Sequence, residues 1–74
     1  MAKQIDFHGY KTQDALKELE SIINTTRLNN KYQELKIITG QGEIQRKIMD
    51  LLDEYDLEWV MPIHNQGFMI IFIE

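Results

Sequence analysis

The stretch LKIITGQG, residues 35–42, lies at the middle of this chain and decides how the rest is arranged. Its first five residues are mostly aliphatic and β-branched, which is typical of a strand. Gly40 and Gly42 then mark a turn, and the apolar residues that follow recur with helical spacing. We therefore expect a strand over 35–39, a glycine-rich turn, and a helix over about 43–55.

A second strand that ends at a glycine lies near the N-terminus, in Ile5-Asp6-Phe7-His8-Gly9. Apolar and polar residues alternate here, which predicts a short strand followed by a turn. Ile5 and Phe7 then lie on one face of the strand, while Asp6 and His8 share the other. In that arrangement one of the two side chains can hold a phosphodiester's water molecule or metal ion while the other transfers a proton.

The remaining elements follow from the same periodicities. A helical stripe of apolar residues predicts a helix over about 13–28, with Thr12 as its N-cap. Residues 57–63 read as a strand, and the proline within it favours a place at the edge of a sheet. After a turn at 64–67, the continuous apolar run 68–73 is typical of a central strand covered on both sides.

The resulting order is β-α-β-α-β-β in a single domain, residues 1–74. We expect an α/β fold of the α+β two-layer sandwich type, with a four-stranded mixed sheet and two helices on one face. The first three strands would run parallel and the last antiparallel. Trp59, Phe68 and Phe72 are interpreted as core. The uncovered sheet face is expected to carry an apolar patch drawn from Ile38, Val60, Met69, Ile71 and Ile73.

Composition excludes several classes of protein. The 74 residues are 43% hydrophobic and 27% charged, as in an ordinary globular domain. The chain has no cysteine, which excludes disulfides and thiolate metal sites and favours a cytoplasmic location. No apolar run approaches the roughly 18 residues that a membrane span needs. The N-terminus has no apolar signal region, so we expect no secretory signal.

Charge is distributed unevenly along the chain. The net charge of −4 argues mildly against a nucleic-acid partner. All eight Lys and Arg residues, however, lie in residues 1–49 with six acids, which gives +2, whereas residues 50–74 carry six acids and no Lys or Arg. We expect an acidic end of the fold that lies away from the glycine turn.

The topology places three loops at one edge of the sheet, where the carboxyl ends of parallel strands meet and ligands usually bind. These loops contain His8-Gly9, Gly40–Gly42 and His64–Gly67. Backbone N–H groups at Gly40–Gly42, next to a helix N-terminus, could hold a phosphate, or the glycines could simply form a tight turn. Asp6 and His8 could likewise be solvated or joined by a local hydrogen bond. One aspartate and two histidines do not make a tight metal site.

The combination of these motifs resembles the Smr (small MutS-related) domain. Ile5–Gly9 is similar to the family's Leu-Asp-x-His-Gly motif, and Ile37–Gly42 lies where the family has His-Gly-x-Gly. The resemblance covers about residues 3–74. Thr39 stands in place of the second motif's histidine, and Gln41 in place of its usual basic residue.

The resemblance implies a nucleic-acid-binding domain, since Smr domains bind nucleic acids and several nick DNA or cleave RNA. It identifies Asp6 and His8 as catalytic, with Asp6 orienting water or a Mg²⁺ ion and His8 acting as general acid or base. The residues expected to contact phosphate or nucleic acid are Gly9, Lys11, Thr39, Gly40, Gln41, Gly42, Arg46, Lys47, His64 and Asn65.

Our leading hypothesis from the sequence is therefore a DNA or RNA endonuclease, with a role such as DNA repair or recombination. Two alternatives stay open. The first is a non-catalytic module that binds RNA or the ribosome in ribosome rescue or quality control, which the replacements at Thr39 and Gln41 favour. The second is a protein-interaction domain that uses the open sheet face or the acidic end. The sequence leaves the oligomeric state open.

Overall fold

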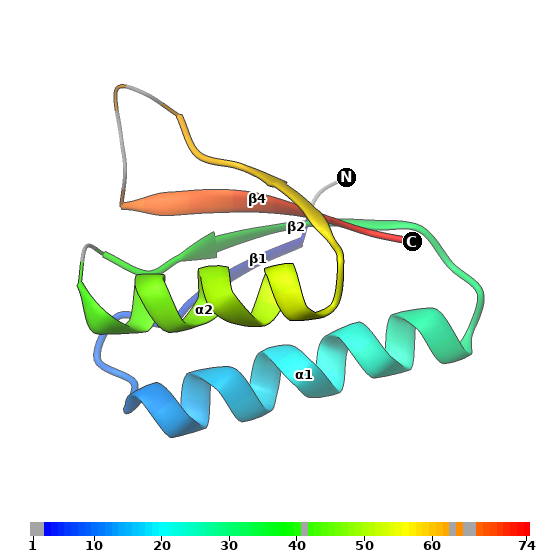
Figure 1. The fold of residues 1–74 in the computed structure, drawn as a ribbon, viewed down its shortest axis with the longest axis horizontal. Helices are drawn as coiled ribbons and strands as arrows, with labels where there is room; N and C mark the ends of the chain where they lie inside the picture. Colours follow the sequence, from blue (N-terminus) through cyan, green and yellow to red (C-terminus); the bar gives the residue numbers. More distant parts are fainter. Residues whose placement is uncertain (1–2, 41, 63, 65–66) are drawn as a thin grey trace.

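The computed structural model describes residues 3–40, 42–62, 64 and 67–74. Four strands form one sheet, and both helices cover the same face of it (Figure 1). The predicted two-layer fold and its β-α-β-α-β-β order are confirmed. The elements are β1 (Lys3–Asp6), α1 (Thr12–Leu28), β2 (Gln33–Ile38), α2 (Glu43–Glu54), β3 (Glu58–Val60) and β4 (Phe68–Ile73).

The sheet has the strand order β1-β2-β4-β3. β1 pairs with β2 in parallel, and β4 pairs antiparallel with both β2 and β3. β1, β2 and β3 therefore share one direction and β4 opposes them, as the sequence predicts. β3 lies at an edge, also as predicted. Because β4 is inserted between β2 and β3, the start of β4 lies directly beside the end of β2.

Several element boundaries differ from the prediction, among them β2, which spans Gln33–Ile38 rather than 35–39. Thr12 is the first residue of α1 rather than its N-cap, because Lys11 has the extended backbone of a capping residue and its carbonyl accepts the Ala15 N–H at 3.0 Å. β3 is shorter than predicted because Leu57 lies in the turn that ends α2, where its N–H donates to the Leu52 carbonyl at 3.0 Å. Ile63, the end of the predicted strand, lies outside the described residues.

The core lies between the sheet and the helices. β4 alternates along its length, so it is covered on one face only and not on both as predicted. Met69, Ile71 and Ile73 are fully buried beneath the helices, so the expectation that they join an open apolar patch is wrong. Register gives the reason: these residues lie on the same face as buried Leu35 and Ile37 of β2.

The sheet face opposite the helices, which we call the open face, carries the other set of side chains. Phe68 and Phe72 are half-buried there, so their interpretation as core is wrong, whereas Trp59 packs against the core. Ile38 and Val60 lie on the open face as expected. From the strand register, its members are Gln4, Asp6, Glu34, Lys36, Ile38, Glu58, Val60, Phe68, Ile70 and Phe72.

Candidate functional site

The loops after β1 and β2 and the loop before β4 meet at one end of the molecule (Figure 1). The Gly67 carbonyl accepts the N–H groups of both Thr39 and Gly40 at 2.9 Å, which joins the start of β4 to the end of β2. The Phe7 N–H donates to the Ile38 carbonyl at 2.8 Å and extends the pairing of β1 with β2 to the edge of the sheet. The predicted convergence of loops is therefore confirmed for their described residues, with Gln41, Asn65 and Gln66 outside the described part of the chain.

The turn after β1 is held by hydrogen bonds at both of its ends. The Asp6 carboxylate accepts the backbone N–H of His8 at 2.8 Å, and the Phe7 carbonyl accepts the N–H of Tyr10 at 2.9 Å. Gly9 has φ +88°, which the third position of such a turn requires. Fully buried Phe7 anchors the turn, while His8 stays exposed. Asp6 thus positions the backbone of His8, and the pair is a local hydrogen-bonded one.

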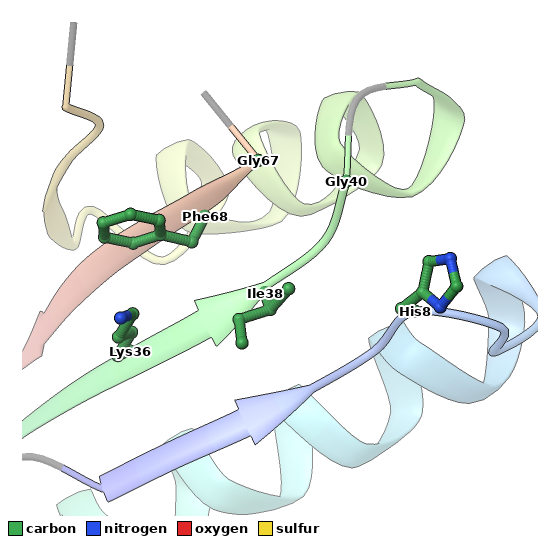
Figure 2. A pocket seen from close by; sticks show the side chains of 6 residues that line it. All are labelled: His8, Lys36, Ile38, Gly40, Gly67 and Phe68. Atoms are coloured by element: carbon green, nitrogen blue, oxygen red, sulfur yellow. The ribbon is translucent and has the colours of Figure 1, made fainter. Parts of the chain in front are cut away.

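A shallow pocket of about 280 Å³ lies on the open face at this end of the sheet. Six of the described residues line it: His8, Lys36, Ile38, Gly40, Gly67 and Phe68. Figure 2 shows His8 and Phe68 on opposite sides of the pocket with Ile38 between them. The Lys36 ammonium lies 4.2 Å from the centroid of the Phe68 ring, a cation–π contact. The pocket therefore combines an apolar floor with two side chains that can donate hydrogen bonds to an anion.

Lys36 and Phe68 are not among the residues that the sequence predicts for the site. The alternation in β2 does place Lys36 on the same face as Ile38, and that signal was available. Phe68 lies within an unbroken apolar run, so its face follows only from its pairing with Ile38 in the folded sheet.

Several predicted residues reach this pocket or its turn. His8 and Gly40 line it, while Asp6 and Gly9 shape the turn that presents His8. Thr39 does not reach it. Its side chain is buried on the helix-covered side, and its hydroxyl donates to the Gly40 carbonyl at 2.7 Å. The Gly40 N–H is already bonded to Gly67, so this amide is committed within the fold.

Other predicted residues lie elsewhere. Arg46 and Lys47 are exposed on α2, where they line a separate hollow with Glu43 and Asp50. That hollow belongs to the helix layer, not to the open face. Gly42 is the N-cap of α2, with φ +138° and no side-chain cap.

Lys11 and His64 are exposed and are not among the described residues that line the pocket. Gln41 and Asn65 lie outside the described residues.

The opposite end of the open face is acidic. Register places Glu34 and Glu58 on either side of Phe72 in the neighbouring strands. Burial raises the pKa of the nearby Tyr32 phenol, and the carboxylates of Glu34, Glu74 and Glu58 raise it further. The predicted acidic end away from the glycine turn is therefore confirmed on the open face.

The described residues supply few ligands for a metal ion. Within ranges 3–40, 42–62, 64 and 67–74, no three His, Asp or Glu side chains gather as a group that could hold one. Asp6 supplies one carboxylate beside the pocket, and that group already accepts the His8 N–H. A Mg²⁺ ion would have to be held mainly by a substrate phosphate. Mg²⁺ stays a prediction from the sequence.

Comparisons with known proteins agree with this fold. The chain is similar to the crystal structure of the Smr domain of Thermus thermophilus MutS2, with a TM-score of 0.79, 18% identity and 99% of each chain covered. At this identity the likeness shows the fold alone. A comparison with curated proteins found no match. No helix among the described residues is long and apolar enough to cross a membrane. The family model of the Smr domain matches residues 5–67, and the chain therefore belongs to the Smr domain family.

Proposed function

We propose that this domain binds nucleic acid at the pocket formed by the ends of β1 and β2. The observation that carries the proposal is the pocket lining itself, in which His8 from the turn after β1 and Lys36 from β2 flank an apolar floor. Smr domains as a family have nucleic-acid-binding and nuclease roles. Glu34 and Glu58 at the acidic end of the open face would repel phosphates and so confine a bound nucleic-acid strand to this pocket.

Two side chains would make the phosphate contacts. The Lys36 ammonium and an imidazole N–H of His8 can each donate a hydrogen bond to a phosphodiester oxygen. Asp6 is the acid of the open face at this end, and its carboxylate is engaged with the turn that holds His8. The binding is electrostatic, so its affinity should fall steeply as salt concentration rises.

A binding assay tests this proposal with a matched pair of variants. Fluorescence anisotropy of labelled RNA and DNA is measured over a salt series for the wild type, Lys36→Gln and Lys47→Gln. Lys47 is an exposed lysine on α2, away from the pocket. We expect Lys36→Gln to weaken binding and to reduce the salt slope by about 1, while Lys47→Gln leaves both near wild type. Weakening by Lys47→Gln alone would contradict the proposal.

Phosphodiester cleavage is a second candidate function, favoured by the geometry of the His8 turn. Asp6 fixes the backbone of His8 while its imidazole remains exposed at the pocket. In cleavage, a water or ribose hydroxyl would attack phosphorus and the P–O bond to the leaving group would break. The proton of the attacking group would pass to bulk water, His8 would give a proton to the leaving oxygen, and Lys36 would stabilise the negative charge on the phosphate.

The cleavage candidate is tested with Asp6 and His8 variants on RNA and on supercoiled DNA, with and without Mg²⁺. His8→Ala should abolish cleavage. Asp6→Asn keeps an oxygen that can accept the His8 N–H, so it should retain more activity than Asp6→Ala if Asp6 acts by positioning. Cleavage that persists in His8→Ala would exclude this pocket as the catalytic site.

A further inference from the structure

Two phenylalanines on β4 share the open face but differ in their surroundings. Phe68 pairs across the sheet with Ile38 and lines the pocket beside Lys36. Phe72 lies four residues further along, between Glu34 and Glu58. Both rings are half-buried, so each leaves part of its surface open to solvent. Phe68 has the Lys36 ammonium beside it and Ile38 opposite it, whereas Phe72 shares a hollow with Arg27 and three carboxylates, those of Asp56, Glu58 and Glu74.

The shape of the pocket suits a small planar group. Figure 2 shows the Phe68 ring and the His8 imidazole on either side, with Ile38 between them. Pockets for drug-sized ligands range from roughly 300 to 1,000 Å³, so the volume of about 280 Å³ lies just below that range. A nucleobase is planar and apolar on its faces, and its edge accepts hydrogen bonds from groups such as the Lys36 ammonium.

We propose that this pocket receives one unpaired nucleobase stacked against Phe68, so that the preferred substrate is single-stranded nucleic acid. The inference rests on the nucleic-acid binding proposed above and names its substrate class. In a duplex both faces of each base are stacked on neighbouring base pairs and cannot reach an aromatic side chain. An unpaired base can leave the stack and take the place of the Lys36 ammonium over the Phe68 ring, which frees Lys36 to contact a phosphate of the same strand beside His8.

The charges on the open face favour a nucleic-acid strand as the occupant. The positive charge of Lys36 complements a phosphate next to the stacked base. Two residues further along the strands, Glu34 and Glu58 flank Phe72 and would repel the next phosphate. The pocket therefore has room for about one base before a strand meets like charge.

A double-mutant cycle between protein and ligand tests the inference. The probes are a labelled single-stranded RNA, the same strand in a duplex, and an abasic strand that keeps the phosphates. Each is titrated into the wild type, Phe68→Leu and Phe72→Leu. Phe72→Leu is the matched control, since it makes the same change on the same face of the same strand. The abasic strand also removes the base without altering the protein, so the test does not depend on how well a variant folds.

We expect the wild type and Phe72→Leu to bind the single strand about tenfold more tightly than the abasic strand. Phe68→Leu should lose that difference, and the duplex should bind like the abasic strand. Equal affinity for all three probes would overturn the inference and leave the proposed nucleic-acid binding intact. Absence of salt-dependent binding to any probe would overturn both.

Discussion

Each end of the open face carries a half-buried phenylalanine, but the charges around the two rings are opposite, so the two ends suit different partners. At one end Phe68 lies beside Lys36 and His8, and at the other Phe72 lies between Glu34 and Glu58. The difference shows that the net charge of −4 is a poor guide to binding in this protein. Binding depends instead on the charges that lie on the same surface, within about one Debye length of a bound phosphate.

Arg27 offsets only part of the charge at the acidic end, where it lines a hollow with Asp56, Glu58 and Glu74. Arg27 donates from its guanidinium to the Tyr55 carbonyl at 2.8 Å and stacks over the Tyr55 ring at 5.6 Å from its centroid. It thus joins the end of α1 to the end of α2. Four carboxylates remain near this end of the sheet, from Glu34, Asp56, Glu58 and Glu74.

The largest expected effect comes from making both ends acidic. Lys36→Glu places a carboxylate beside Phe68 and should weaken RNA binding by roughly a hundredfold, because a phosphate contact is replaced by like-charge repulsion. Anisotropy titration at fixed salt measures the loss. Lys17→Glu on the exposed surface of α1 changes the net charge equally and serves as the control. Equal losses in the two variants would mean that net charge, and not the pocket, governs binding.

The reverse change should extend the binding surface. Replacing both Glu34 and Glu58 by lysine surrounds Phe72 with cations, and a longer strand could then cross the whole open face. We expect roughly tenfold tighter binding of a long single strand and a salt slope steeper by roughly 1 to 2. A short oligonucleotide that fills only the pocket should gain much less. An equal gain in affinity for the long and the short oligonucleotide would contradict the view that the two ends of the open face act separately.

A smaller effect is expected from the turn that presents His8. Gly9 has φ +88°, and a Cβ added there would meet no atom within 4 Å, so the strain in Gly9→Ala arises from the backbone alone. The free energy of unfolding should fall by about 1 kcal/mol. Urea denaturation measures this change. Gly9→Asn, which tolerates this backbone region better, should lose less stability, and an unchanged stability in Gly9→Ala would contradict the described turn.

The smallest effect reports on the acidic end. The carboxylate of Glu34 contributes to the raised pKa of Tyr32. Glu34→Gln removes this negative charge, which stabilises the phenolate and should lower the Tyr32 pKa toward 10.0. The absorbance of tyrosinate against pH measures the change in a background where Tyr10 and Tyr55 are replaced by Phe. A pKa that stays fixed would show that the Glu34 carboxylate does not contribute to the shift.

Periodicity and glycine positions were sufficient to predict the fold. The alternation in Ile5–Gly9 placed Asp6 and His8 on one face, and the glycines placed the turns. β4 was harder because residues 68–73 are all apolar, so the sequence carries no sign of which side chains face the helices. Its pairing with β2 decides that, and pairing is a property of the folded sheet.

The site was predicted in part for related reasons. Thr39 continues the alternation of buried Leu35 and Ile37, so its burial could have been predicted from β2 alone. Arg46 and Lys47 follow the glycine turn closely in sequence, but their helix covers the opposite face of the sheet from the pocket. Closeness along the chain is therefore a poor guide to the positions of Arg46 and Lys47. The lysine that lines the pocket is Lys36 of β2.

A residue-by-residue NMR titration with a short single-stranded RNA tests the central claim most directly. If the pocket end of the open face is the binding site, the amide shifts should concentrate at His8, Lys36 and the Gly67–Phe68 segment. The amide shifts of Glu34, Glu58 and Phe72 should remain unchanged at the other end of the same sheet. Shifts centred on Arg46 and Lys47, or on the acidic end, would contradict it.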